Sequence, residues 1–278
     1  MLARAAPFFL ADEAGGQRFC VLHRPAQDKV LGAIVYVHPF AEEMNKSRRM
    51  ASLQARAFAS AGFAVLQCDL LGCGDSSGDF GDATWDDWLA DVARAVAWMR
   101  QRHDAPLTLW GLRAGCLVAC EAARRHSLDG DFLFWQPMTA GKLALQQHLR
   151  LHAAKDMLDG QAGGGTQPLR ERLTRGDTLD IAGYGLNPAL AAGLDLATLQ
   201  ASPGGRSVWL EVSTRDEPGL LPASAALIDR WKASGHQVVE HVVKGPPFWN
   251  ATEIEEAPEL IAATSATIHR EPIADCTP

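Results

Sequence analysis

The chain has 278 residues, a formal net charge of −7 and 47% hydrophobic residues. This composition is typical of a globular protein and excludes a disordered, fibrous or disulfide-stapled chain. The acidic charge argues against a general nucleic-acid-binding protein, because such binding needs a basic face that replaces the counterions of the phosphates. No apolar run reaches the ~18 residues that a membrane helix needs, so we expect no membrane span.

The N-terminal apolar run is too short and too broken by Pro7 to be a secretory signal, and Asp12 and Glu13 follow it directly. We therefore expect a cytoplasmic protein. Its six cysteines form no C-x-x-C pair, so we expect thiols rather than a metal or thioredoxin-like redox site. We also expect no cofactor, and the oligomeric state stays open.

Two segments near the N-terminus, Pro7–Leu10 and Arg18–His23, are expected to form an antiparallel hairpin. Six short apolar runs follow, each bounded by turn residues. Runs that are apolar throughout, rather than alternating, are typical of strands buried on both faces of a parallel sheet. The six expected strands are Ala33–His38, Ala64–Asp69, Leu107–Trp110, Asp131–Trp135, Ser207–Val212 and Gln237–Val243.

Helical patterns lie between the expected strands. Met50–Ala61 is amphipathic and is followed by Gly62, which is a typical helix end. Thr84 is expected to cap Trp85–Arg102, whose first turn holds two aspartates. A third helix, Ala114–His126, follows the third of the six strands. Alternating strands and helices predict a doubly wound, mostly parallel α/β sheet.

The strand spacing locates an insertion, because 76 residues separate the starts of the runs at Asp131 and Ser207. This distance is too long for one crossover helix. It contains a helical stretch, Lys142–Leu158, and a glycine-rich segment, Gly160–Gln167, which we expect to be flexible. The expected division is a core of residues 1–141 and 204–270, a helical lid or cap of residues 142–203 over the carboxyl edge of the sheet, and a disordered tail of residues 271–278.

Residues Leu107–Gly115 (LTLWGLRAG) predict a strand, a sharp turn with two glycines and a helix. This is the layout of the G-x-S-x-G nucleophile elbow, which presents its middle residue at a helix N-terminus beside the oxyanion-hole amides. Here the middle residue is Arg113. A guanidinium group stays protonated and cannot attack a carbonyl carbon.

With this context, residues 7–268 resemble the α/β-hydrolase superfamily. His38-Pro39-Phe40 stands where such hydrolases carry an oxyanion loop, and Asp69–Gly78 resembles their D-x-x-G-x-G-x-S-x-G turn. Asp216 follows the next-to-last strand, where the superfamily has its catalytic acid. The resemblance implies the α/β-hydrolase fold and an activity on ester-type bonds.

Four further segments are similar to the exosortase A system-associated hydrolase 2 family. They are HPFAEEMNKSRRM (His38–Met50), WGLRAG (Trp110–Gly115), FWQP (Phe134–Pro137) and GPPFWN (Gly245–Asn250). This resemblance implies a link to exopolysaccharide and PEP-CTERM protein-sorting systems, and the family's name implies a hydrolase.

Two of the three roles of a Ser-His-Asp triad are vacant in this sequence. Arg113 replaces the serine, and the segment after the last strand, Lys244–Asn250, holds no histidine. Asp216 alone performs no acyl transfer. We therefore predict a triad-depleted protein, a pseudoenzyme, that binds a small anionic, glycan or acyl ligand through Arg113 under the lid.

An arginine at the elbow is costly unless it meets an anion or a carboxylate. The candidate partners within the chain are Glu42, Glu43, Asp75 and Asp216. The candidate ligand-binding residues around Arg113 are His38, Phe40, Glu42, Leu112, Ala114, Phe248 and Trp249. Lys46, Arg48 and Arg49 add local positive charge, in a segment that we expect to be either a solvated loop, with a helix starting at Asn45 or Ser47, or a polar wall of the pocket.

Several alternatives stay open. Glu43, Glu42 or Asp216 could activate water while Arg113 stabilises an oxyanion, which would make a non-standard ester or thioester hydrolase or an acyltransferase.

Cys116 and Cys73 fit buried hydrophobes better than displaced thiolates. The pair His148 and His152 has metal-like spacing but no third ligand, so we expect no metal. In a last alternative, Phe248 and Trp249 fill the pocket and Arg113 makes a purely structural salt bridge.

Overall fold

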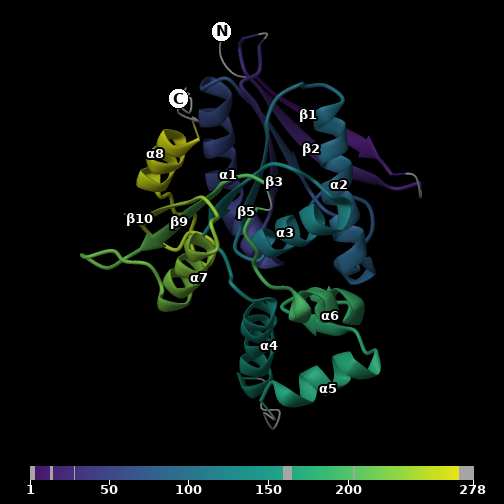
Figure 1. Cartoon of the computed structure of the whole chain (residues 1–278). Helices are drawn as coiled ribbons and strands as arrows, with labels where there is room; N and C mark the ends of the chain where they lie inside the picture. The colour runs from purple at the N-terminus through teal and green to yellow at the C-terminus, as the bar shows by residue number, and fades with distance from the viewer. Residues whose placement is uncertain (1–3, 13–14, 28, 159–164, 203, 269–278) are drawn as a thin grey trace.

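The computed structural model describes residues 4–12, 15–27, 29–158, 165–202 and 204–268, and a doubly wound α/β sheet forms their centre (Figure 1). In this part of the chain, eight strands stand in the order β1-β2-β4-β3-β5-β6-β9-β10. They are β1 (Arg4–Ala11), β2 (Gln17–Arg24), β3 (Gly32–Val37), β4 (Phe63–Cys68), β5 (Leu107–Leu112), β6 (Asp131–Trp135), β9 (Ser207–Ser213) and β10 (Val238–Lys244). β1 pairs with β2, and β2 with β4, antiparallel, whereas the other neighbours are parallel. The predicted hairpin and all six predicted strands are therefore confirmed.

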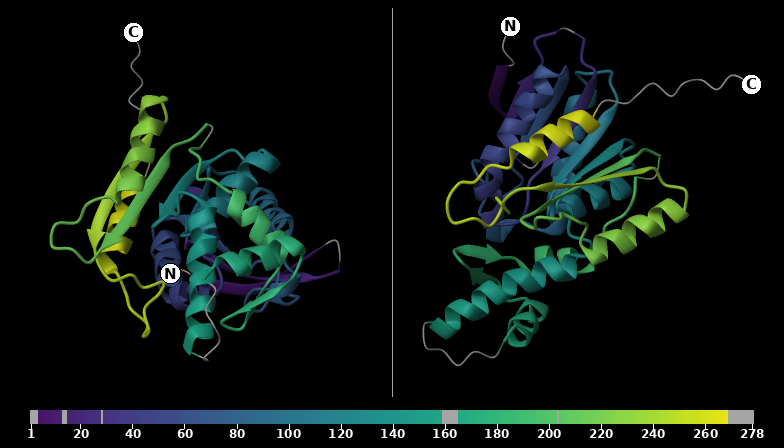
Figure 2. Two further views of the ribbon diagram at one scale, coloured as in Figure 1. Left: turned by 90° about the horizontal axis from the view of Figure 1, so that it is seen from below. Right: turned by 90° about the vertical axis from the view of Figure 1, so that its left-hand side faces the viewer.

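The central strands are apolar throughout because helices cover both faces of the sheet. Every residue of β3 and of β6 is buried. Helices α1 (Glu42–Ser60) and α8 (Pro258–Thr267) pack on one face. Helices α2 (Trp85–Arg100), α3 (Gly115–His126) and α7 (Pro222–Ala233) pack on the other, and Figure 2 shows the two layers from below.

Two helix starts show where local sequence signals succeed and where they fail. Thr84 caps α2 as predicted: its hydroxyl accepts the N–H of Asp87, and the Asp87 carboxylate accepts the N–H of Thr84. The predicted start of the first helix at Asn45 or Ser47 is wrong, because α1 already begins at Glu42. Glu42 and Glu43 in the first turn stabilise this start, because their negative charges lie at the positive end of the helix dipole. The Ser47 hydroxyl does not cap α1 but donates to the Glu43 carbonyl inside the helix.

The chain between β6 and β9 forms a separate group of elements at one end of the sheet (Figure 1). They are α4 (Gly141–Leu158), α5 (Gln167–Arg175), β7 (Leu179–Ile181), β8 (Tyr184–Leu186) and α6 (Pro188–Leu196). The Asn187 amide ties this group to the 3-10 helix η1 (Phe80–Asp82) by donating to the Gly81 carbonyl, at 2.9 Å. Most of the glycine-rich segment 160–167 and the whole predicted tail 271–278 lie outside the described residues.

A buried charge network fixes the hairpin to α2. The Arg18 guanidinium, 3% exposed, contacts Asp12 at 2.9 Å and Asp91 at 2.7 Å. Asp91, 1% exposed, also accepts from Arg94 and from the Leu71 N–H. Among the helices of the described residues, none is long and apolar enough to cross a membrane.

Candidate functional site

The turn between β5 and α3 has the geometry of an elbow. β5 ends at Leu112, α3 begins at Gly115, and Arg113 between them has a φ of 56°. A left-handed backbone is unfavourable for a residue with a Cβ and is kept where the surrounding structure imposes it. A Cβ at Gly115 would lie 2.4 Å from the carbonyl oxygens of Val37 and His38, and one at Gly111 would lie 2.6 Å from the Cys116 Cα. Only glycine fits these two positions.

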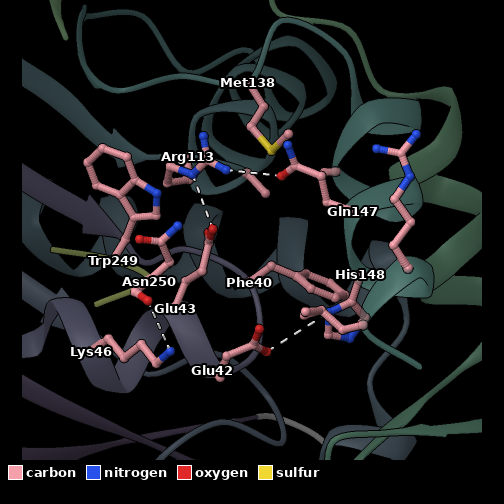
Figure 3. Close-up of a pocket in the computed structure, with 14 residues that line it drawn as sticks. Phe40, Glu42, Glu43, Lys46, Arg113, Met138, Gln147, His148, Trp249 and Asn250 are labelled. Atoms are coloured by element: carbon pink, nitrogen blue, oxygen red, sulfur yellow. Dashed lines mark hydrogen bonds and ion pairs between the residues drawn. The ribbon is translucent and has the colours of Figure 1, made fainter. Parts of the chain in front are cut away.

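A cavity of about 470 Å³ opens beside the elbow (Figure 3). Its lining comes from the start of α1, the elbow, α4 and the loop after β10. The lining residues are Phe40, Glu42, Glu43, Lys46, Arg113, Ala114, Met138, Ala144, Gln147, His148, Arg150, Leu151, Trp249 and Asn250. The alternative of a pocket filled by aromatic side chains is therefore wrong.

Arg113 is held in this cavity from two sides. Its Nε donates to Glu43 Oε1 at 3.2 Å, and its Nη2 donates to Gln147 Oε1 at 3.1 Å. The guanidinium carbon lies 5.3 Å from the ring centre of Trp249. Within the described chain, no hydrogen bond uses Nη1, so the guanidinium group keeps donors for a ligand. Of the four partners that the sequence left open, Arg113 pairs with Glu43.

The Glu43 carboxylate is buried, and its contacts do not fully compensate for the loss of hydration. Burial raises its pKa, the charge and hydrogen bond of Arg113 lower it again in part, and the neighbouring Glu42 raises it. The net direction is upward, so the loss of hydration outweighs the attraction of Arg113. A carboxylate of this kind costs stability unless a ligand or a further donor compensates it.

A second polar pair, Glu42 and His148, lines the same cavity. His148 Nδ1 lies 3.9 Å from Glu42 Oε2, and its ring meets the Phe40 ring edge-on at 5.0 Å. Burial lowers the pKa of His148, and the Glu42 charge opposes this shift. Neither Glu42 Oε2 nor His148 Nε2 has a hydrogen-bond partner within the described chain. The His152 side chain is outside the described part, in which no group of three metal-ligating residues occurs.

Several predicted site residues lie elsewhere. His38 uses both ring nitrogens inside the core: Nδ1 donates to the Pro39 carbonyl at 2.8 Å, and Nε2 accepts the Leu70 N–H at 3.2 Å. Leu112 and Phe248 are 0% and 1% exposed and do not line the cavity. The Asp216 side chain is 98% exposed and pairs with Lys244 outside the cavity.

Comparisons with known proteins agree with this architecture. The serine aminopeptidase S33 family model matches residues 28–157. Est1E from Butyrivibrio proteoclasticus, solved with ferulic acid bound, is 15% identical with a TM-score of 0.65, over 93% of this chain and 96% of its own. XC6422 from Xanthomonas campestris, described as an α/β serine hydrolase without lid, is 15% identical with a TM-score of 0.56, over 95% and 93%. A search of curated proteins finds no match.

This chain has the α/β-hydrolase fold. The family model and the solved structures together support the α/β-hydrolase superfamily. In an α/β hydrolase the elbow residue is the nucleophile and a histidine follows the last strand. Here the elbow residue is Arg113, and the stretch 245–257 after β10 contains no histidine.

The two thiols that the sequence raised as alternative nucleophiles are both buried. Cys116 and Cys73 are 0% and 6% exposed. Burial raises the pKa of both thiols, so they stay protonated and poorly nucleophilic. Both behave as the small buried hydrophobes that the sequence favoured.

Sequence reasoning missed the contribution of α4. Gln147, Arg150 and Leu151 reach the cavity from this helix, and so does His148, for which the sequence suggested only metal-like spacing. A signal was available for Asn250, which adjoins Trp249 in the GPPFWN motif. Of the predicted cluster of positive charges, Lys46 and Arg113 line the cavity, whereas the other two arginines pair with Asp69 and Glu256.

Proposed function

We propose that this protein binds a small anionic or strongly polar molecule at Arg113 and does not cleave esters through a serine nucleophile. The observation that carries the proposal is the replacement of the elbow nucleophile by a guanidinium group that opens into a cavity and keeps unused donors. Arginine binds carboxylates and phosphates through two parallel hydrogen bonds, which gives it both strength and geometric selectivity.

The charges around the cavity favour the same class of ligand. Arg113, Lys46 and Arg150 are cationic, whereas Glu42 and Glu43 are the acidic lining residues. His148 is uncharged at neutral pH because burial lowers its pKa. The lining therefore carries an excess of positive charge, although the whole chain is acidic.

The proposed biological setting rests on the sequence resemblance. Similarity to exosortase A system-associated hydrolase 2 proteins favours a ligand from an exopolysaccharide or protein-sorting pathway. We propose that residues 142–203 act as the lid of this site, since α4 supplies Gln147 and His148 to the cavity. We propose a cytoplasmic setting for this function, in which the thiols would stay reduced.

Calorimetric titration tests the proposal with phosphate, butanoate and galacturonate as simple phosphate, carboxylate and sugar-acid probes. We expect the wild type to bind at least one probe, and Arg113→Gln to bind it about tenfold or more weakly, because a hydrogen bond from a charged donor is lost. Arg230→Gln is the control, since Arg230 is exposed on α7 and outside the cavity. A wild type that binds none of the probes, or an Arg113→Gln variant of equal affinity, would contradict the proposal.

Labelling with a fluorophosphonate tests the second half of the proposal. These reagents react with an activated serine, so we expect no covalent adduct on the wild type. We also expect none on Arg113→Ser, because a serine there has no histidine base after β10. An adduct on the wild-type protein would show a working serine nucleophile and contradict the absence of one.

A second candidate function is a hydrolase or acyltransferase that uses Glu43 as base. The supporting observation is a carboxylate with a raised pKa, 3.2 Å from Arg113. The same cavity is lined by Ala114, whose position corresponds to an oxyanion amide. Water would add to the substrate carbonyl carbon while Glu43 takes the water proton, and that proton would later pass to the departing oxygen of an ester or sulfur of a thioester as its bond to the carbonyl carbon breaks. Turnover of an ester or thioester panel that Glu43→Gln abolishes would favour this candidate over the binding protein.

A further inference from the structure

Two cavities meet at Arg113. Besides the cavity of about 470 Å³, a neighbouring one of about 230 Å³ lies between α4 and the start of α7. Both cavities include Arg113, Met138, Gln147 and Arg150 in their lining. These four residues therefore form the boundary, and two of them, Arg113 and Gln147, are joined by a hydrogen bond of 3.1 Å that Figure 3 shows from the side of the larger cavity.

The boundary between the cavities is cationic. Arg113 keeps Nη1 unused, and Arg150, exposed on α4, makes no ion pair with an acidic residue of the described chain. Arg113, Arg150 and Gln147 each line both cavities, so a negatively charged group at the boundary is within the reach of two cationic residues and one amide. An anionic head group fits this position by charge and by hydrogen bonding.

The two cavities differ in chemistry. The larger cavity also carries Glu42, Glu43 and Lys46, whereas the smaller one has no charged lining residue other than the two shared arginines. The smaller cavity instead contains Leu143 from α4 and Leu221 at the start of α7, which are 48% and 47% exposed. Exposed leucines from two separate elements that line one groove are a surface that a hydrocarbon chain can cover.

We infer that the ligand is an amphiphile: a single acyl chain that carries an anionic head, as in a fatty acid. The head binds Arg113 and Arg150 at the boundary, and the chain lies between α4 and α7 over Leu143 and Leu221. The larger polar cavity is left for any polar group attached to the head. This inference rests on the proposed anion site and adds the class of its ligand.

The test compares butanoate, decanoate and neutral 1-decanol by calorimetry, below the concentrations at which they aggregate. Each methylene group that leaves water contributes roughly fourfold in affinity, so partial covering of the six additional groups makes decanoate tenfold or more tighter than butanoate. We expect 1-decanol to bind about tenfold or more weakly than decanoate, because it has no charge for the arginines.

Single substitutions locate the acyl chain of the bound ligand. We expect Leu143→Gln and Leu221→Gln each to weaken decanoate about threefold to tenfold and to leave butanoate unchanged. Leu196→Gln is the matched control, because Leu196 is 83% exposed on α6 of the same insertion and lines neither cavity. Loss of decanoate affinity in Leu151→Gln but not in Leu143→Gln would place the chain in the larger cavity and overturn the inference.

Failure of this inference differs from failure of the proposed function. If butanoate and decanoate bind equally and Arg113→Gln abolishes the binding of both, the anion site stands and the acyl groove is overturned. If neither carboxylate binds the wild type, the acyl groove is overturned as well, and phosphate and galacturonate then decide the fate of the anion site. Equal losses in Leu143→Gln and Leu196→Gln would also overturn the groove, since they would indicate a general effect of exposed leucines.

Discussion

Two arginines of this protein meet carboxylates in opposite ways. Arg18 lies 3% exposed between Asp12 and Asp91, and Asp91 has two further donors, Arg94 and the Leu71 N–H. Arg113 lies 13% exposed with one carboxylate, Glu43, at 3.2 Å, and keeps unused N–H groups at a cavity. The first arrangement is closed by the chain itself, whereas the second is open to a ligand.

The contrast separates a charge cluster that the chain satisfies by itself from one that it leaves open, as the proposed anion site requires. Buried ion pairs offset their loss of hydration when hydrogen bonds surround each charge, as they do at Asp91. At the elbow the pKa of Glu43 is raised, so the attraction of Arg113 does not offset the loss of hydration there. Stability is given up at functional sites when binding needs groups that folding does not satisfy.

The largest effect is expected from opening the closed network. Asp91→Ala leaves the Arg18 charge with Asp12 alone and the Leu71 N–H without its acceptor. Removing one partner of a buried ion pair costs about 3–5 kcal/mol of unfolding free energy. Urea unfolding measures the loss. Asp86→Ala on the same helix is the control: its side chain is 78% exposed, so we expect a loss below about 1 kcal/mol.

Equal losses for Asp91→Ala and Asp86→Ala would mean that the buried network contributes no more than a surface pair. The comparison with Arg113 would then lose its basis, because the degree of hydrogen bonding would not distinguish the two arginines.

The second-largest effect is expected at the elbow, where Arg113 has a left-handed backbone and Gly115 follows it closely. Gly115→Ala brings a Cβ to within 2.4 Å of the carbonyl oxygens of Val37 and His38. These are backbone atoms, so we expect a loss of about 1–3 kcal/mol in urea unfolding, together with weaker anion binding at Arg113. Gly219→Ala is the control, because nothing lies within 4 Å of a Cβ there. Unchanged stability and binding in Gly115→Ala would show that the elbow tolerates movement.

Much of this fold could be predicted from the sequence, and the reason is local. Continuous apolar runs marked the six strands, and Thr84 with Asp87 marked the start of α2. The two elbow glycines placed Arg113 correctly at the turn, because backbone crowding leaves no other residue type there. Such signals depend on a few neighbouring residues and need no knowledge of distant packing.

The partners of Arg113 were harder to predict because they depend on long-range packing. The choice of Glu43 over Glu42 required the true start of α1, and Ala41, which precedes it, makes no side-chain cap that could signal this start. Gln147 and His148 reach the site only because α4 packs against the elbow from an insertion. Phe248 and Trp249 are neighbours, yet Phe248 is buried against Trp135 and only Trp249 lines the cavity.

A smaller effect, of opposite sign, is expected at Glu43. Its pKa in the folded state is raised above the ordinary 4.5, so the folded protein binds the proton more tightly than the unfolded chain does. Stability is therefore full below pH 4.5 and falls as the pH rises through the raised value. Glu43→Gln cannot ionise, so we expect it to be slightly more stable than the wild type at neutral pH and to lose this gain at pH 4. Urea unfolding at the two pH values checks this.

A loss of stability in Glu43→Gln at neutral pH would contradict the view of an open, unfavourable charge. It would show that the pair with Arg113 is a net stabilising contact, and the two arginines would then differ only in degree.

The smallest effect concerns the second polar pair of the cavity. Burial lowers the pKa of His148 below its ordinary 6.5, so its contribution to stability is present above pH 6.5 and is lost as the pH falls through the lowered value. His148→Gln removes this dependence, and we expect its stability to fall less than that of the wild type between pH 7.5 and pH 5. Glu42→Gln should steepen the fall, because the Glu42 charge stabilises protonated His148 at 3.9 Å. Parallel curves for all three proteins would show that the pair is not coupled, and that Glu42, unlike Glu43, has no cationic partner in this cavity at acidic pH.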